Sequence, residues 1–501
     1  MDLLGNLYFG FSVALAPVNL FFCFVGVFLG TLVGVLPGLG PAATIALLLP
    51  ITFNLGPEAA IIMIAGIYYG AQYGGSTTSI LINIPGEASS VVTCLDGYQM
   101  ARRGRAGPAL GISAFGSFIG GTLSIVGLML LGPVLASFAL QFGPPEYFAL
   151  MLLGVVILTF LSQGSMVKSF ISALIGLFVG TIGVDTVYGV HRFTFGSFTL
   201  TDGVGLVPVA MGLFGIAEVL TNLEQQAVRD VFKTKIKGLL PTRQDWKESM
   251  GPIARGSIIG FFLGILPGGG AILASFTSYA VEKRVSKNPD AFGKGAIAGV
   301  AGPETANNAA TGGAMIPLLS LGIPSNVIMA LLIGAMMIHG IKPSCFLVQE
   351  HPQVFWGVIT SMYVGNAILL ALNLPLIPLW VRLLKIPYGI LFPLILLFCL
   401  IGVYTVNNNA FEVLIMLIFG AVGYLMRKAG FEPAPLVFAM VIGPIMEMAL
   451  RQSLLQSRGT FAIFFTRPIS AVALGFACLL LLTTLLPHFK KRRQQYDQFK
   501  E

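Results

Sequence analysis

Two clusters of small polar residues interrupt otherwise apolar stretches of the chain and could form a binding site. One covers residues 74–79 and 83–87, and the other covers residues 302–313 and 322–326. Glycine and proline punctuate both clusters, so we expect the helices to unwind there. An unwound segment offers oxygen atoms to a cation, and the helix that restarts after it offers free N–H groups to an anion. The predicted site residues are Ser76, Thr77, Thr78, Asn83, Thr305, Asn307, Asn308 and Thr311.

Glu87 and Glu304 are the carboxylates of the two clusters. A carboxylate inside a membrane is costly and usually functional, although each of these could instead cap a helix at the membrane surface. Neither cluster contains Lys or Arg. A bound anion would therefore be held by N–H groups, hydroxyls, amides and a co-bound cation. The alternative is that the polar side chains only join helices through hydrogen bonds.

A glycine-rich stretch occurs twice. Residues 26–40 and 256–270 share seven of fifteen residues, at a constant separation of 230 positions. Glycines four residues apart make a helix face on which another backbone packs closely, and the Leu-Pro-Gly that follows breaks the helix. We therefore expect one re-entrant hairpin at 26–50 and another at 253–280, although two packing faces that end in a turn would read the same way. The predicted hairpin tips are Pro37, Gly38, Gly40, Pro267, Gly268 and Gly270.

The charges around the two copies predict opposite orientations in the membrane. The segments before Gly26 and at 51–58 carry no Lys or Arg, whereas 229–247 and 283–294 are rich in them. Basic loops stay in the cytoplasm, so the hairpins should enter from opposite sides, as in an inverted repeat. We expect a first repeat at 1–222, which contains a broken helix at 59–94, and then a basic cytoplasmic linker at 223–249. A second repeat follows at 250–487, with a broken helix at 295–338 and an extra C-terminal helix. The chain is expected to end in a basic cytoplasmic tail at 488–501.

Composition places the chain in the membrane. Of its 501 residues, 55% are hydrophobic and 10% are charged, against roughly 25% charged in a soluble protein. We predict an all-α polytopic membrane protein in the lipid bilayer, with about eleven crossings besides the two hairpins. The net charge of +8 lies in short clusters between apolar runs, which argues for topology and against nucleic acid. The five scattered cysteines indicate neither a disulfide framework nor a metal cluster.

The basic loops also predict where the chain ends lie. The C-terminus should be cytoplasmic, and the N-terminus should lie on the opposite, periplasmic side. Arg451, Arg458 and Arg467 depart from this pattern, because they would lie outside.

Three features carry a resemblance to a known family: the paired Leu-Pro-Gly segments, Pro-Glu-Thr-Ala-Asn-Asn-Ala-Ala-Thr-Gly-Gly at 303–313, and Leu-Gly-Ile-Pro at 321–324. From about Gly26 to the final span, the chain resembles the large membrane subunit of the tripartite tricarboxylate transporters, called TctA. The resemblance implies a secondary transporter of the bacterial inner membrane that works with a small membrane subunit and a periplasmic solute-binding protein. It implies import of carboxylates such as citrate, driven by a sodium or proton gradient and without another cofactor.

The two opposed hairpins predict an elevator-type mechanism, in which hairpins and broken helices carry the site past a scaffold of longer spans. A sodium site is expected near Asn307 and Asn308. A gated ion or anion channel on the same inverted repeat is the alternative, and saturable uptake that collapses with the ion gradient would separate the two. An enzyme is not expected, because the chain has no HExxH motif, and ATP-driven transport is not expected without a GxxxxGK[ST] loop.

Overall fold

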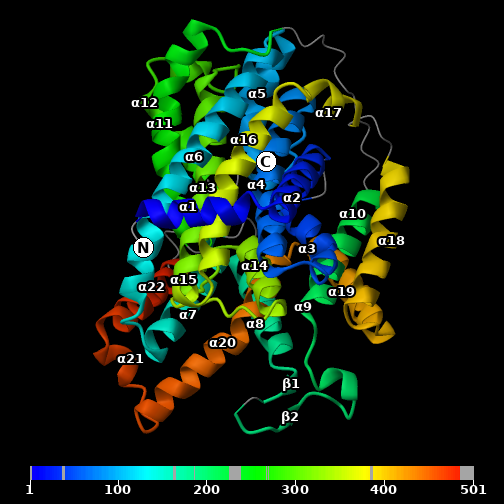
Figure 1. The fold of residues 1–501 in the computed structure, drawn as a ribbon, viewed down its shortest axis with the longest axis vertical. Helices are drawn as coiled ribbons and strands as arrows, with labels where there is room; N and C mark the ends of the chain where they lie inside the picture. The colour runs from blue at the N-terminus through cyan, green and yellow to red at the C-terminus, as the bar shows by residue number, and fades with distance from the viewer. Residues whose placement is uncertain are drawn as a thin grey trace. The chain divides into compact units, whose positions relative to one another are not determined.

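The computed structural model describes residues 3–36, 40–161, 165–185, 187–224, 238–266, 268, 270–383 and 388–485. These residues are mostly helical, with one short hairpin of β1 (Gly183–Val184) and β2 (His191–Arg192) (Figure 1). Seven described helices are long and apolar enough to cross a membrane, and six shorter apolar helices accompany them. The chain is therefore an all-α polytopic membrane protein. The count differs from the expected eleven because several apolar helices are shorter than the roughly 20 residues that a bilayer requires.

The chain divides into two compact units. The larger unit comprises residues 1–139 and 205–428, and the smaller comprises 140–204 and 429–501. Each unit takes segments from both predicted repeats. In the larger unit the helices that position the candidate site are α2 (Pro17–Val35), α3 (Pro41–Thr52), α4 (Pro57–Ile82), α5 (Val91–Arg102), α6 (Ala106–Ala139), α11 (Arg243–Ile265), α12 (Gly270–Val285), α13 (Ala298–Leu321), α14 (Val327–Ile338) and α16 (Pro352–Asn373).

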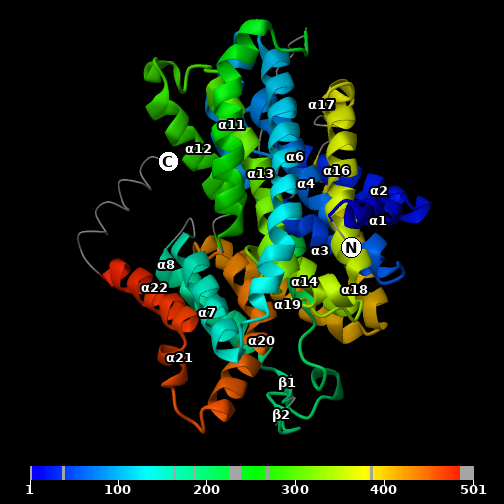
Figure 2. The same cartoon turned by 60° about the vertical axis from the view of Figure 1, so that its left-hand side comes forward.

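Other helices complete both units. The larger unit also contains α1 (Leu3–Ala14), α9 (Leu206–Ala210), a π-helical turn at Met211–Ile216, α10 (Ala217–Glu224), α15 (Leu347–Glu350), α17 (Ile377–Leu383), α18 (Tyr388–Asn407) and α19 (Ala410–Lys428). The smaller unit contains α7 (Pro144–Leu161), α8 (Met166–Gly180), the β-hairpin, α20 (Ala434–Gln456), α21 (Ile463–Thr466) and α22 (Pro468–Leu485). Within it, α8 and α22 both pack against α7, and α20 packs against α7 and α8 (Figure 2).

Two helix pairs in the larger unit pack backbone against backbone at glycines. A Cβ atom added at any of these glycines would lie 2.2 to 2.5 Å from a carbonyl oxygen of the facing helix, α4 for α2 and α13 for α11. Such contacts leave no room for a side chain, so the repeated glycine face serves close helix packing. The glycines are Gly26, Gly30 and Gly34 in α2, and Gly256, Gly260 and Gly264 in α11.

The facing residues in α4 and α13 are spaced as regularly as the glycines. Gly30 faces the carbonyl of Ile67, and Gly260 faces the carbonyl of Ala306. Gly30 and Gly260 are 230 positions apart in the sequence, and the residues that they face are 239 positions apart. The glycine contacts one helical turn before and one turn after show the same two separations. The two pairs therefore make equivalent contacts, and the chain between the paired helices is nine residues longer in the second copy.

Both α4 and α13 end at a residue with left-handed backbone. Asn83 (φ 57°) ends α4 and Gly322 (φ 69°) ends α13, and the two are again 239 positions apart. An Ile-Pro pair follows each, and proline cannot continue the helix. The chain restarts as a 3₁₀ turn (Ala88–Ser90) and α5 in the first copy, and as α14 in the second.

The polar runs at 74–79 and 302–313 are helical, so the expectation that they unwind is wrong. Their hydroxyls donate to carbonyls of their own helix, as Ser79 does to Gly75 at 2.9 Å and Thr305 to Ala301 at 2.7 Å. These bonds satisfy the hydroxyls without opening the helix. The interruptions lie further along, at 83–87 and 322–326, where the prolines are.

The predicted hairpin tips are partly described. Gly40 immediately precedes α3, while Gly268 (φ 77°) and Gly270 (φ 50°) turn the chain into α12. The backbone N–H of Gly268 donates to the carbonyl of Ser325 at 2.6 Å, which places this tip against the interruption after α13. Pro37, Gly38 and Pro267 lie outside the described residues.

The buried carboxylate of Asp96 holds α13 and α12 in place. Asp96 of α5 is fully buried and accepts the backbone N–H groups of Gly295 and Ala296 at 2.7 and 2.8 Å, just before α13. It also accepts the Tyr279 hydroxyl of α12 at 2.9 Å. α13 in turn lies against both α11 and α6 (Figure 2). The helix that carries the second polar cluster is thus fixed at its start by the first half of the chain.

Two of the three arginines that departed from the charge pattern, Arg451 and Arg467, form ion pairs in the smaller unit. Arg467 binds the buried Glu146 at 2.8 Å. Arg451 binds Asp185 at 2.8 Å and Glu447 at 2.7 Å. Because Arg451 and Arg467 are each held in place by an acidic partner, their charges do not indicate which side of the membrane they occupy.

Candidate functional site

Glu304 is a buried carboxyl in the second turn of α13, with 1% of its surface exposed. Its two oxygens accept short hydrogen bonds from the hydroxyls of Ser76 in α4 and Thr93 in α5. Both donors belong to the first half of the chain and Glu304 to the second. The carboxyl therefore joins the two halves.

Glu87 is the second buried carboxyl, and it lies in the interruption after α4. One oxygen accepts the backbone N–H of Ser89 at 2.8 Å, so the side chain caps the 3₁₀ turn that follows. The other accepts Nδ2 of Asn307 in α13 at 3.2 Å. When the side-chain amide of Gln72 in α4 is oriented with its nitrogen toward Glu87 and Asn307, it donates to Oε1 of Glu87 at 3.0 Å and to Oδ1 of Asn307 at 2.7 Å.

The contact between Glu87 and Asn307 has an equivalent in the other half. Asn326 lies in the interruption after α13, caps α14 through Oδ1, and donates from Nδ2 to the Tyr68 hydroxyl of α4 at 3.4 Å. Asn307 follows Tyr68 by 239 positions, and Asn326 follows Glu87 by the same number. Each interruption therefore touches the long helix of the opposite copy at the same place.

Neither Glu87 nor Glu304 takes part in an ion pair among the described residues. Their hydrogen-bond partners are hydroxyls, amides and a backbone N–H group. A buried carboxylate without a cationic partner is expensive to keep charged. A proton or a cation bound at these carboxyls would remove this cost.

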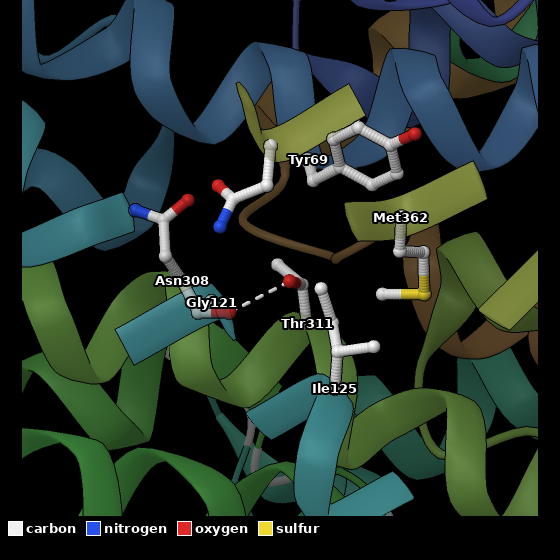
Figure 3. Close-up of a pocket in the computed structure, with 7 residues that line it drawn as sticks. Tyr69, Gly121, Ile125, Asn308, Thr311 and Met362 are labelled. Atoms are coloured by element: carbon white, nitrogen blue, oxygen red, sulfur yellow. Dashed lines mark hydrogen bonds between the residues drawn. The ribbon is translucent and has the colours of Figure 1, made fainter. Parts of the chain in front are cut away.

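A small pocket lies beside α13 at Asn308, the residue that follows Asn307. Tyr69, Gly121, Ile125, Asn308, Thr311, Met362 and Asn366 line it (Figure 3). Its free volume is about 10 Å³, close to the minimum that holds one water molecule and far below the several hundred Å³ of a typical organic ligand site. In Figure 3 the amide oxygen of Asn308 faces the pocket.

Comparison with known proteins places the chain in a family. Residues 20–438 match the sequence model of the tripartite tricarboxylate transporter TctA family. The chain belongs to the TctA family. The match covers both polar clusters, both glycine-rich stretches and all residues of the larger unit that build the site. TctA proteins are subunits of transporters, which agrees with the spans of this chain.

One curated relative matches nearly the whole chain, and two others match about half of it. An uncharacterized 52.8 kDa protein in the TAR-I ttuC′ 3′ region of Agrobacterium vitis is 51% identical over 497 residues, which cover 99% of each chain. An uncharacterized protein in the TAR-II ttuC′ 3′ region of the same organism is 50% identical over 236 residues, covering 47% of this chain and 98% of the relative. An uncharacterized protein of Methanocaldococcus jannaschii is 24% identical over 276 residues, covering 54% and 64%. No solved structure matches the chain.

The structure of this TctA protein brings four of the eight predicted site residues into two buried groups. Ser76 contacts Glu304, Asn307 contacts Glu87, and Asn308 and Thr311 line the pocket. Thr305 packs against α6. Three others lie apart from these contacts: Thr78 donates within α4 at 2.9 Å, Thr77 is buried in the same helix, and Asn83 is exposed at its end.

Several residues of the site were not among those predicted. The carboxyls Glu87 and Glu304 are not among the eight side chains that the sequence predicts for the site. Gln72, Thr93 and Ser117 carried no signal, because each is a single polar residue that the fold alone brings to α13. The sequence does contain a signal for the two glutamates, because each is a carboxyl within a polar run of a membrane protein that has no Lys or Arg.

Proposed function

We propose that this chain is the large subunit of a binding-protein-dependent secondary transporter that imports carboxylates such as citrate, driven by a sodium or proton gradient. It would act in a bacterial inner membrane with a small membrane subunit and a periplasmic solute-binding protein. The C-terminus would be cytoplasmic and the N-terminus periplasmic. Membership of the TctA family supports the transport of carboxylates, and the contacts of the larger unit support the remaining steps.

The reciprocal contacts of the two interruptions carry the proposal of an inverted repeat. In a pair of twofold-related copies, a contact from one copy to the other must occur twice, with the partners exchanged. The contacts Glu87–Asn307 and Tyr68–Asn326 have this relation. The opposite charge of the segments flanking the two glycine-rich stretches supports opposite orientations in the membrane.

The charge of the site supports coupling to cations. A carboxylate substrate would meet two buried carboxyls, Glu87 and Glu304, with no described Lys or Arg paired to them. Bringing a third negative charge there is unfavourable unless protons or cations enter with it. The free N–H groups at the start of α14 would then face the substrate anion. Substrate and cation would thus bind together, as symport requires.

The small pocket supports an occluded conformation. A free volume of about 10 Å³ leaves no room for citrate beside α13, so the hairpins and interruptions must move before a substrate enters. We propose that they move with the polar clusters as an elevator. Cysteine pairs placed between the hairpins and the longer spans should crosslink in two mutually exclusive sets, and a single invariant set would contradict this motion.

Uptake into proteoliposomes tests the function. The chain would be reconstituted with its small subunit and solute-binding protein, and labelled carboxylates would be supplied under separate sodium and proton gradients. We expect saturable uptake that requires the binding protein and stops when one gradient is collapsed. Uptake that does not saturate and ignores both gradients would favour a channel.

A variant links uptake to the site. Asn307→Ala removes the bond to Glu87 and should abolish uptake while the protein still assembles. Asn373→Ala is the matched control, because Asn373 is a buried asparagine of α16 outside both polar clusters, and it should transport normally. Normal uptake by folded Asn307→Ala would remove this residue from the site.

A further inference from the structure

We propose that the pocket beside α13 binds one sodium ion, with the side-chain oxygens of Asn308, Thr311 and Asn366 as ligands. The pocket lies between α13, α6 and α16, which supply Asn308, Gly121 and Asn366 (Figure 3). This proposal gives the coupling cation a position in the structure. Sodium binding at the pocket does not depend on the proposed transport function, but the role of the ion in transport does.

Asn308 carries the argument, because it is buried with an unused acceptor. Its Nδ2 donates to the Ser117 hydroxyl at 2.7 Å and to the backbone carbonyl of Glu304 at 3.1 Å. These two bonds fix the orientation of the amide and turn Oδ1 to the opposite side, into the pocket (Figure 3). Oδ1 has no hydrogen-bond partner among the described residues, although Asn308 is only 1% exposed. A buried carbonyl oxygen left in this way costs free energy unless something fills its place.

Asn366 also lines the pocket and has its amide donor engaged elsewhere. Its Nδ2 donates to the Phe118 carbonyl and to the Thr122 hydroxyl, both at 2.9 Å. Its Oδ1 accepts the Tyr73 hydroxyl at 2.8 Å and keeps a second lone pair. Both asparagines therefore have their Nδ2 donors engaged, Asn308 with α6 and with its own helix, and Asn366 with α6. The pocket is left with oxygens and with few groups that could donate to an anion.

The lining selects the kind of ligand. None of the pocket residues is acidic or basic, so a divalent cation would lack the carboxylates that it usually takes. The same residues do not titrate near neutral pH, so they cannot carry a proton. Neutral hard oxygens suit an alkali cation. The free volume of about 10 Å³ is at the lower limit for a water molecule, which favours sodium over the larger potassium ion.

The position of the pocket gives the ion a mechanical consequence. Asn307 and Asn308 are consecutive in α13, and they face Glu87 and the pocket respectively. An ion that binds oxygens of both α13 and α16 would hold α13 in the register in which Asn307 meets Glu87. Sodium binding should therefore stabilise the folded chain even without substrate.

Sodium binding to the purified full-length chain tests the proposal. The melting temperature and the binding of radioactive sodium would be measured against sodium chloride, with potassium chloride or choline chloride keeping the ionic strength constant. We expect a saturable rise in melting temperature with sodium alone. Asn308→Ala and Thr311→Val should each weaken sodium binding at least tenfold.

Two further variants separate loss of the ion from loss of the fold. Gly121→Ala removes no ligand, but its Cβ would lie 3.1 Å from Nδ2 and 3.2 Å from Oδ1 of Asn366, so it should fill the pocket and abolish sodium binding. Asn373→Ala is the matched control, because Oδ1 of Asn373 is also buried and unpartnered among the described residues, yet does not line the pocket. It should bind sodium as the wild type does.

Two results would overturn the assignment. Sodium affinity unchanged in folded Asn308→Ala and Gly121→Ala would mean that the pocket holds only water. An equal response to potassium would refute the choice of sodium. No substrate or partner is present in these measurements, so sodium binding without carboxylate uptake would keep this site and reject the proposed transport.

Discussion

The substitution Gly260→Ala tests the backbone packing on which the site depends. In an ordinary helix, alanine is better than glycine by about 1 kcal/mol. At position 260, however, the added Cβ would lie 2.2 Å from the carbonyl oxygen of Ala306 and 2.7 Å from its Cα, distances that real Cβ atoms do not show. α11 would have to move away from α13 by about 1 Å, and contacts along the interface would weaken.

The magnitude follows from two opposing effects. Overpacking a close contact costs about 1–3 kcal/mol, and a clash with rigid backbone belongs at the upper end. Subtracting the gain in helix propensity of about 1 kcal/mol leaves a net loss of about 2 kcal/mol. Gly30→Ala, whose Cβ would lie 2.5 Å from the carbonyl of Ile67, should cost a similar amount. Uptake should fall with both, because α4 and α13 carry the polar clusters.

The assay is equilibrium unfolding of the purified protein in mixed micelles, together with the melting temperature. Gly475→Ala in α22 is the control, because a Cβ there meets nothing within 4 Å. It should be neutral or stabilise by up to about 1 kcal/mol. A Gly260→Ala protein as stable as the wild type would show that α11 and α13 are not in backbone contact, and the positioning argument for the site would be lost with it.

Two further predictions concern polar contacts. Thr93→Val removes a hydroxyl that donates to the buried Glu304 and should lower the free energy of unfolding by about 1–3 kcal/mol. The control Thr159→Val removes only a hydrogen bond to a carbonyl of its own helix and should lower it by less. Equal losses for the two variants in unfolding experiments would contradict the prediction for Thr93. Hydrogen bonds from Arg451 lower the pKa of Asp185 to about 2 from an ordinary 3.8. The stabilising effect of Asp185 is therefore complete above pH 3.8 and is lost as the pH falls toward 2, so the difference in melting temperature between wild type and Asp185→Asn should be constant at higher pH and shrink only within that window.

Residue spacing was enough to predict where the helices of the larger unit meet. Glycines at every fourth position form a smooth face whatever the rest of the fold does, so Gly30 and Gly260 could be recognised as contact positions without coordinates. The polar runs were recognised for a similar reason, since Ser76 and Asn307 stand in stretches too polar to face lipid. Their occurrence in both halves also pointed to a duplicated arrangement.

The helical state of these runs was not predicted, because two local effects compete. Glycine and proline disfavour a helix, while hydroxyls that bond to carbonyls of their own helix, and neighbours that pack closely on glycine, preserve it. In the run that contains Thr305 the second effect prevails, because α6 and α11 pack directly against α13. Only the positions of those helices decide the outcome.

The amino-acid sequence alone is enough to assign the membrane class, the repeated glycine faces and the likeness to the TctA family, because hydropathy and helix periodicity are local properties of the chain. The partners of the buried groups needed the tertiary structure. Glu304 meets Ser76 across 228 positions, and Asn308 meets Ser117 across 191. No local spacing encodes such contacts, since they arise when helices from both halves pack together and each buried polar atom takes the nearest available partner.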